Sequence, residues 1–366
     1  MTRLHIDARL AAHSGIGIYL TELLPRVVPA LAQWQPVVLC SPTHAATMSR
    51  HIGASAEIVA FDAKPLGLAD LFSMPPGVAP GDLLWTPHFN VPLRSRVALA
   101  VTLHDLLPLT MPEFAGRGRA LPVRAWLRAI AARARTVMCV SNFTRGEALR
   151  FCRIDPARVV VTPNGVDRAW VSAGAAAMPE SAPTMIYVGM LKPHKNVARL
   201  LRAFASVRDR IAHRLVLVAR ISDIRNIDRE ALSLARAHSD RVELVEGLAF
   251  EALVARVKSA QFAVQPSLHE GFGLPALEAM AAGTPVLAGR AGALPEVCGN
   301  AALYCDPESV DDIARGILEL ANDAALRGRL AAAGRARASL FSWDACATAT
   351  TEALDRALVS VQGDSA

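Results

Sequence analysis

Short apolar segments alternate with helical stretches along the chain of 366 residues, and this alternation restricts the fold more than any other feature. Apolar segments this short are typical of strands buried on both faces of a parallel sheet. Strands that alternate with helices predict βαβ units and therefore the α/β class. The expected strands are 4–7, 37–40, 83–85, 97–103, 137–140 and 159–162 in the first half, and 185–188, 215–218, 242–245, 262–265 and 286–287 in the second.

The alternation stops once, in a segment rich in alanine and proline that runs from Val171 to Pro183. Such a composition is typical of a linker. A chain of 366 residues is also longer than one hydrophobic core usually supports. The sequence therefore predicts Rossmann-like domains at 1–170 and 184–342, joined by a linker at 171–183.

The chain has no obvious membrane or secretion segment. No apolar run approaches the roughly 20 residues that cross a bilayer, and the amino terminus enters a strand without a signal-peptide core. We therefore expect a cytoplasmic protein. The six cysteines lack the spacing of a metal site, and we interpret them as reduced packing residues.

Basic residues are concentrated in one segment of a chain whose net charge is +6. Neither a nucleic-acid module nor a platform of interleaved aromatic side chains is present, which argues against a nucleic-acid partner. A basic helix suits an anionic membrane surface better, and a solvated basic helix is an equally consistent interpretation. The segment from Phe114 to Gly146 has no acidic residue and contains Arg117, Arg119, Arg124, Arg128, Arg133, Arg135 and Arg145, with Trp126 and Leu127 beside them.

Two carboxylates lie on either side of a glycine turn that follows the expected strand at 262–265. Seven residues separate Glu270 from Glu278, and Gly271 and Gly273 allow a tight turn with exposed backbone amides. Glu278 falls among apolar residues in a first helical turn, where an ionised carboxylate needs hydroxyl or amide donors around it. The pattern predicts a polyol ligand, although either glutamate alone is also consistent with a helix-dipole or solvated turn residue.

The helix after this turn opens at a proline. Pro275 loses no hydrogen bond there, because the first amides of a helix have no intrahelical partner. We expect the amides of Leu274, Ala276 and Leu277 to point outward with the positive end of the helix dipole. An anion such as a phosphate suits that position.

The whole segment PSLHEGFGLPALEAMAAG, residues 266–283, resembles the glutamate, seven residues, glutamate signature of retaining glycosyltransferases of family 4. The resemblance implies the GT-B fold, with two Rossmann-like domains whose parallel sheets face each other across a cleft that holds the active site. It implies that Glu270 approaches the donor sugar and that Glu278 holds the ribose hydroxyls of the nucleotide. The turn residues that would present amides to sugar and diphosphate are Gly271, Phe272, Gly273 and Leu274.

The segment YVGMLKPHKNV follows the first strand of the second half and is also similar to this family. Lys195 matches the family's phosphate-binding lysine, although a solvated lysine in a turn is the simpler interpretation. It precedes a helix expected to begin near Asn196, so its ammonium and the helix amides would share a diphosphate. Many relatives carry arginine where this chain has Met190, and Lys192 and Arg220 are the substitutes that we consider.

Two strand ends of the first half add candidates. In VTLHDL, His104 matches the family's catalytic-site histidine, which contacts the donor sugar, and Asp105 would orient its ring. A hydrogen-bonded structural histidine is the other interpretation. WTPHFN is similar to an acceptor-side segment, which makes His88 and Asn90 weaker candidates; turn chemistry alone would also explain Asn90.

The first and last segments complete the resemblance. HSGIGIY is similar to the family's glycine loop, in which Gly15 and Gly17 let the backbone approach the diphosphate and the acceptor. Leu20 occupies the third glycine position of the dinucleotide fingerprint, which argues against a nicotinamide cofactor. The final segment FSWDA resembles the family's last element, which implies that residues 343–366 pack back on the N-terminal domain.

The resemblance implies a retaining hexosyltransferase that uses a nucleotide sugar and a sugar acceptor. The segments HDLLPL and PHKN are most similar to bacterial enzymes of O-antigen, lipopolysaccharide or exopolysaccharide synthesis, so mannose from GDP-mannose is the expected donor and a UDP- or dTDP-sugar the alternative. A polyprenyl-diphosphate-linked acceptor would explain the segment from Arg117 to Arg135 through peripheral attachment at the inner face of the plasma membrane.

We expect no metal and no other cofactor, because the chain has no Asp-x-Asp motif. Lys195 and the helix amides would then stabilise the leaving group. Two functions from other classes stay open: a nucleotide-sugar epimerase with the same fold, and a non-catalytic protein that binds nucleotide sugars.

Overall fold

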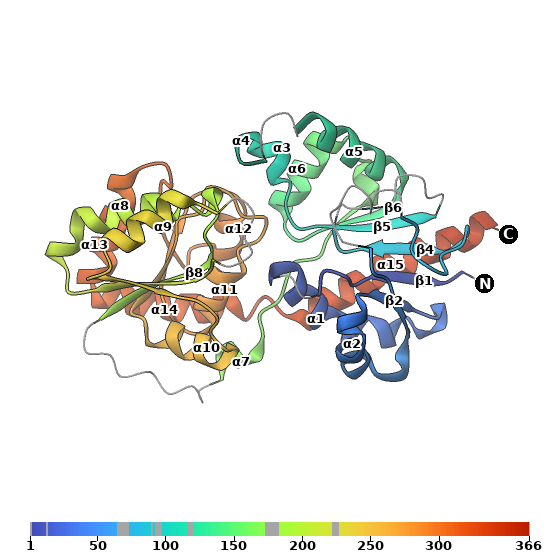
Figure 1. Cartoon of the computed structure of the whole chain (residues 1–366), viewed down its shortest axis with the longest axis horizontal. Coiled ribbons are helices and arrows are strands. Elements are labelled where there is room, and N and C mark those ends of the chain that lie inside the picture. Colours follow the sequence, from blue (N-terminus) through green and yellow to red (C-terminus); the bar gives the residue numbers. More distant parts are fainter. Residues whose placement is uncertain are drawn as a thin grey trace. The chain divides into compact units, whose positions relative to one another are not determined.

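The computed structural model describes residues 2–11, 14–63, 73–88, 91, 97–115, 120–172, 183–221 and 227–365. The chain divides into unit 1, made of Met1–Gly165 and Ser342–Ala366, and unit 2, made of Val166–Phe341. Each unit contains one parallel sheet (Figure 1). The predicted α/β class with two Rossmann-like domains is confirmed. Of the predicted linker at 171–183, residues 173–182 lie outside the described residues.

The sheet of unit 1 has the order β3-β2-β1-β4-β5-β6-β7. One face is covered by α5 and α6, whose Leu127, Ile130 and Ala148 belong to the same buried cluster as the strands. The last helix α15 packs on α1 and on β4, β5 and β6. The elements are β1 (Leu4–Asp7), α1 (Ser14–Ala30), β2 (Val37–Cys40), α2 (Ala45–Ile52), β3 (Glu57–Ala60), β4 (Leu83–Thr86), β5 (Ala98–Leu103), α3 (Leu107–Thr110), α4 (Pro112–Ala115), α5 (Ala120–Arg133), β6 (Ala134–Cys139), α6 (Asn142–Cys152), β7 (Val159–Val161) and α15 (Trp343–Ser365).

The sheet of unit 2 has the order β10-β9-β8-β11-β12-β13. Its elements are α7 (Arg168–Val171), β8 (Thr184–Met190), the 3₁₀ helix η6 (Pro193–Lys195), α8 (Val197–Val207), η7 (Arg208–Arg210), β9 (Arg214–Arg220), α9 (Arg229–Ala237), β10 (Val242–Val245), α10 (Phe250–Ser259), β11 (Phe262–Gln265), α11 (Leu274–Ala281), β12 (Val286–Gly289), α12 (Leu294–Cys298), β13 (Leu303–Cys305), α13 (Val310–Asn322) and α14 (Ala324–Ala338).

Helices α8, α9 and α13 lie on one face of the unit 2 sheet (Figure 1). Helix α8 buries Val197, Leu201 and Phe204, which recur with the helical period and form one stripe. Leu215 and Leu217 of β9 meet that stripe from the sheet. The chain crosses the sheet in one direction from β8 to β9 and in the other from β11 to β12. Because both crossovers are right-handed, α11 lies on the face opposite to α8.

Two edge strands, β3 and β13, were not predicted from the sequence. Each lies at one end of its sheet. The residues of β3 are half-buried or exposed, so Glu57–Ala60 lacks the continuous apolar run that marks a central strand. The strands predicted in the middle of each sheet are present, with ends that differ by a few residues.

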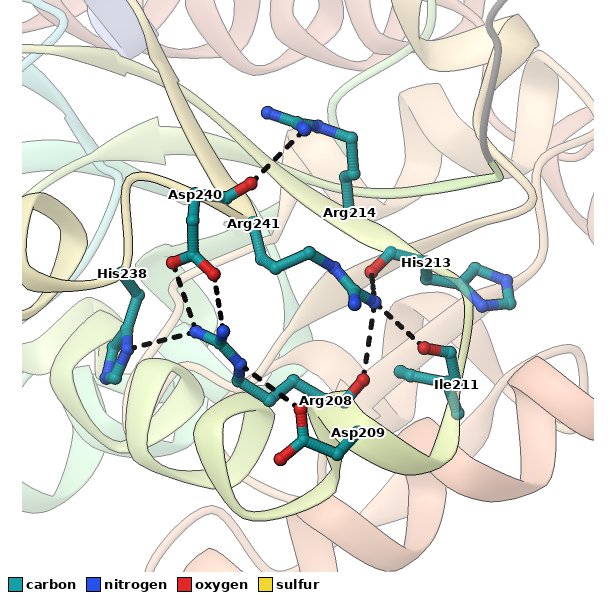
Figure 2. Close-up of polar contacts among 8 residues, drawn as sticks. All are labelled: Arg208, Asp209, Ile211, His213, Arg214, His238, Asp240 and Arg241. Atoms are coloured by element: carbon teal, nitrogen blue, oxygen red, sulfur yellow. Dashed lines mark hydrogen bonds and ion pairs between the residues drawn. The ribbon is translucent and has the colours of Figure 1, made fainter.

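The amino ends of β9 and β10 are held by a cluster of arginines (Figure 2). One guanidinium nitrogen of Arg241 donates to the carbonyl oxygens of Arg208, Ile211 and His213 at 3.3, 2.8 and 2.7 Å. Arg208 forms an ion pair with Asp240. These contacts satisfy backbone carbonyls at the edge of the sheet opposite to the strand ends that carry Lys195 and Glu270.

The six cysteines are buried and unpaired, as predicted for packing residues. Burial raises the pKa of Cys139 and Cys298 to about 12, so both thiols stay protonated at neutral pH. Within the described residues, no helix combines the length and the apolar character that a membrane span requires.

Candidate functional site

The strand order of unit 2 reverses between β8 and β11. The chain runs outward from β8 to β9 and β10, returns to β11, and continues to β12 and β13. Open parallel sheets bind ligands outside the carboxyl ends of their strands at such a reversal. The loops that follow β8 and β11 carry Lys195 and Glu270, so both predicted residues fall where this rule places a ligand.

Lys195 and Glu270 form an ion pair at the reversal although they are 75 positions apart in the chain. Lys195 Nζ lies 2.7 Å from each carboxylate oxygen of Glu270. Ser267 Oγ donates to Glu270 Oε1 at 2.8 Å. The lysine and glutamate side chains are only 14% and 10% exposed. The pair therefore keeps an ammonium and a carboxylate in fixed positions, with their charges balanced.

A glycine after β12 fixes the backbone of Glu270. Gly292 has a φ of +59°, and a Cβ there would lie 2.5 Å from the Glu270 nitrogen and 2.6 Å from its carbonyl oxygen. The Ala293 amide donates to the same carbonyl at 2.8 Å. The loop thus passes directly over Glu270, which only glycine permits. Gly292 was missed in the sequence, where its only signal is a glycine shortly after a predicted strand.

Asn196 joins three strand-end loops, a role that the sequence did not reveal. It is the N-cap of α8, as the expected helix start required, and it adopts the left-handed conformation with φ 64° and ψ 28°. Its Nδ2 donates to the carbonyl oxygens of Pro266 at 2.9 Å and Pro307 at 2.6 Å. Asn196 thereby holds the Lys195 loop against the loop that carries Glu270.

The start of α11 offers fewer free amides than expected. Gly273, with φ +102°, is the N-cap, and its carbonyl accepts from Ala276 at 3.1 Å and from Leu277 at 3.2 Å. The expectation that the amides of Ala276 and Leu277 point outward is therefore wrong, because the N-cap carbonyl turns into the first helical turn. Of the three amides expected to be free, only that of Leu274 has no backbone acceptor among the residues that the structure describes. Phe272 is buried against Phe341, with ring centroids 5.7 Å apart.

Glu278 lies one turn into α11 in an environment that opposes its ionisation. Burial, followed by repulsion from Asp167, raises the pKa of Glu278 to about 7. Among the described residues, no donor makes a hydrogen bond to its carboxylate. A ligand with neighbouring hydroxyl groups would supply the missing donors.

His104 follows β5 in unit 1 as a neutral, partly buried ring. Burial lowers the pKa of His104 to about 4, and Asp105 only partly offsets this. The ring donates to the Pro87 backbone carbonyl, while Nε2 has no partner among the described residues. The expected orientation of the ring by Asp105 is wrong, because this carboxylate turns back to accept from the Leu107 amide at 3.1 Å.

A second buried cluster lies at the unit 1 reversal, between β1 and β4. Asp7 Oδ2 lies 3.3 Å from His88 Nε2, and both carboxylate oxygens of Asp7 accept from Arg9, at 2.9 and 2.6 Å. The arginine and histidine hold the pKa of Asp7 well below its usual range. The structure therefore adds Asp7 and Arg9, whose signal was a charged pair at a strand end. Asn90 lies outside the described residues.

Gly15 and Gly17 lie in the first turns of α1. A Cβ on Gly17 would lie 2.5 Å from the carbonyl oxygen of Ala11, whereas Gly15 has nothing within 4 Å of the same position. Gly17 therefore has a packing requirement of its own, which is independent of any ligand. His13, which begins the glycine loop, lies outside the described residues.

The groups at the strand reversal of unit 2, taken by themselves, suit a polyhydroxylated, anionic ligand. Unit 2 provides an ammonium, a fixed carboxylate, the Leu274 amide and a carboxylate that has no hydrogen-bond donor among the described residues. Unit 1 provides a neutral histidine whose Nε2 can accept a hydrogen bond. Within the described ranges, no group of three His, Cys, Asp or Glu side chains is placed to hold a metal ion.

The sequence matches two families of known proteins. Residues 172–337 match the family described as "Glycosyl transferases group 1", and residues 77–170 match "Glycosyltransferase Family 4". O-antigen chain mannosyltransferase B of Escherichia coli is 31% identical over 281 residues, which cover 73% of this chain and 72% of that protein. An MMP alpha-(1->4)-mannosyltransferase of Mycolicibacterium hassiacum is 34% identical over 62% of this chain and 55% of its own length, so only about half of that relative is matched.

Solved structures with the same fold include a sucrose-phosphate synthase of Thermosynechococcus elongatus, with a TM-score of 0.76 at 21% identity over 98% of this chain and 100% of that one. HepE of Anabaena in complex with UDP-glucose gives a TM-score of 0.75 at 17% identity, over 97% of this chain and 100% of that one. At these identities the likeness concerns the fold alone.

Proposed function

We propose that this chain, which belongs to glycosyltransferase family 4 and is a hexosyltransferase, transfers mannose from GDP-mannose to a sugar acceptor with retention of configuration. The transferred mannose is suggested by two similar proteins, both of which are mannosyltransferases by name. GDP as its carrier follows only from the resemblance of the segments HDLLPL and PHKN. The observation that best supports donor binding in unit 2 is the position of Lys195, Glu270 and Glu278 at its strand reversal.

In the proposed donor complex, Glu278 accepts hydrogen bonds from the ribose hydroxyls, which relieve its unsatisfied carboxylate. Lys195 contacts the diphosphate, and Glu270 turns to the sugar. Amides of the turn at 271–274 reach the sugar and the diphosphate, as does the glycine loop around Gly15 and Gly17. Nε2 of His104 accepts a hydrogen bond from a sugar hydroxyl. His88 and Asp105 remain weaker candidates for binding the acceptor.

In the proposed reaction, the bond between the anomeric carbon and the diphosphate oxygen breaks while the acceptor oxygen bonds to the same face. The acceptor proton passes to the departing diphosphate oxygen, so no separate nucleophile is needed. Lys195 and the turn amides stabilise the charge that grows on the leaving group. This arrangement needs neither a metal ion nor another cofactor.

A donor panel tests this function directly. Purified protein is incubated with GDP-, UDP- and dTDP-sugars in EDTA, and binding is read by thermal shift and slow donor hydrolysis by product analysis. We expect selective stabilisation by GDP-mannose, release of GDP, and α-mannose as the first anomer seen by NMR. Selective use of a UDP- or dTDP-sugar would show that this sugar nucleotide, and not GDP-mannose, is the donor. Activity that vanishes in EDTA and returns with manganese would overturn metal independence. Interconversion of one nucleotide sugar into another without an acceptor would identify an epimerase. Donor binding without turnover with any acceptor would identify a binding protein.

We also propose a lipid-linked acceptor reached by peripheral attachment to an anionic membrane. The support is electrostatic alone, because Trp126 is packed against the core and Leu127 is buried. Arg128 donates to the Phe151 carbonyl at 3.2 Å, and Arg135 is paired with Asp364. Arg117 and Arg119 lie outside the described residues.

Vesicle flotation tests this attachment. We expect the protein to float with vesicles rich in phosphatidylglycerol, to stay down with neutral vesicles, and to detach at about 0.5 M salt, where surface charges are screened. No flotation with anionic vesicles at low salt would remove the membrane proposal and leave the transfer reaction untouched.

A further inference from the structure

We propose that Arg220, at the carboxyl end of β9, binds the donor diphosphate and supplies the net positive charge that Lys195 alone does not provide. The inference rests on the proposed function, in which the donor is a nucleoside diphosphate sugar. Three observations support it. The Lys195–Glu270 pair has no net charge, the strand register places Arg220 at the same edge of the sheet, and no hydrogen bond or ion pair holds its guanidinium among the described residues.

The Lys195–Glu270 pair carries no net charge. Its ammonium lies 2.7 Å from both carboxylate oxygens, and the two side chains are largely shielded from water. A diphosphate that approaches this pair meets a carboxylate as well as an ammonium. A further cation on a neighbouring strand end would therefore strengthen the binding of a dianionic group here.

Arg220 is placed for this role by the sheet. In the pairing of β8 with β9, Arg220 is in register with Met190, at the carboxyl ends of both strands. Tyr187 and Ala219 point into the core under α8 and α9, so Met190 and Arg220 lie on the opposite face of the sheet, which α11 covers. Neighbouring strands are about 4.8 Å apart. An arginine on β9 thus stands beside the apolar Met190, one strand from the loop that carries Lys195.

The Arg220 guanidinium is available for a ligand. Arg220 is exposed, and within the part of the chain that the structure describes no hydrogen bond or ion pair holds its side chain. The next residue is anchored, because the Ile221 amide donates to Glu246 Oε1 at 2.7 Å. A guanidinium on an anchored strand end can bind two phosphate oxygens at once through its planar fork.

Other cations near this edge are already engaged. The guanidinium of Arg290, after β12, lies over the Tyr304 ring at 4.6 Å. Arg199 donates to Asn196 Oδ1 at 2.9 Å. Lys192 follows the strand in the turn before η6, where it contributes to the low pKa of His194, and the strand register does not fix its position. Arg220 is therefore the cation whose position at this edge is fixed by the strand register.

The test compares Arg220→Ala with Arg214→Ala. Arg214 begins the same strand on the same face, and it donates to the Asp240 carbonyl at 3.3 Å (Figure 2). It lies roughly 20 Å from Arg220 along the strand. Both variants lose one positive charge, so the pair separates a local contact from a change in overall charge. Affinities for GDP, UDP and dTDP and for the matching nucleosides are measured by titration and displacement, together with thermal unfolding.

We expect Arg220→Ala to weaken binding of the preferred nucleoside diphosphate by about 10- to 100-fold, as for the loss of a charged hydrogen bond, with an unchanged nucleoside affinity and melting temperature. Arg220→Lys should recover part of the affinity, and Arg214→Ala should stay within about twofold of the parent protein. An Arg220→Ala protein that binds the diphosphate like the parent would overturn the inference. So would an equal loss for diphosphate and nucleoside. If the parent protein binds no nucleoside diphosphate at all, the proposed function fails with it.

Discussion

Lys195→Met is expected to lower kcat/KM for sugar transfer by about 10²- to 10³-fold, because it removes a charge that stabilises the leaving diphosphate. It also leaves the largely buried Glu270 carboxylate with Ser267 as its remaining side-chain partner within the described residues. Breaking such a pair from one side costs about 3 kcal/mol of unfolding free energy. The single variant should therefore lose both activity and stability.

A second substitution separates these two effects. In Lys195→Met with Glu270→Gln, the unpaired carboxylate is gone, so the melting temperature should return most of the way to that of the parent protein while activity stays low. Lys258→Met is the matched control, because Lys258 lies on the surface of α10 and donates to the Ser172 carbonyl. Steady-state kinetics and differential scanning calorimetry provide the readouts. Recovery of transfer in the double variant would show that Lys195 acts only by holding Glu270.

Glu278→Gln is expected to make the donor-free protein more stable above pH 7 and to weaken donor binding by about 10- to 100-fold. Burial raises the pKa of Glu278 from 4.5 to about 7. Between these pH values the folded protein keeps a proton that the unfolded chain has already released. Stability from this group is therefore fully present below about pH 4.5 and is lost as the pH rises through 7, by about 3 kcal/mol. Glutamine stays neutral at every pH, so the variant does not undergo this loss of stability.

The measurement is thermal unfolding of parent and variant from pH 5 to 8, with and without the nucleoside diphosphate that the donor panel selects. The two proteins should have similar melting temperatures near pH 5 and diverge toward pH 8, where the variant is higher. Donor affinity of the parent should rise with pH through about 7, because ribose hydroxyls donate best to the ionised form. Equal pH profiles would show that the pKa of Glu278 is not raised. An unchanged donor affinity in the variant would show that Glu278 does not bind the ribose.

Much of the site could be predicted because its parts are local. The glycine turn, the proline that opens α11 and the seven-residue spacing of the two glutamates follow from backbone preferences over a few residues. The same local reasoning failed at two points where the backbone conformation of near neighbours decides the hydrogen-bond partner. The amides of Ala276 and Leu277 were expected to be free because the Gly273 conformation, which directs its carbonyl into the helix, was not specified. Asp105 was expected to orient the His104 ring, but its carboxylate accepts from the Leu107 amide, two residues along the chain.

The sequence by itself determined the α/β class, the central strands and the residues of the glutamate turn, because apolar periodicity and turn chemistry act between near neighbours in the chain. Only the tertiary structure decided which of these residues meet. Lys195 pairs with Glu270 from 75 positions away, and Arg220 comes beside Met190, because strand order and register bring the carboxyl ends of separate strands to one edge. The low pKa of His104 and the high pKa of Glu278 likewise depend on the burial that the folded chain creates around each group.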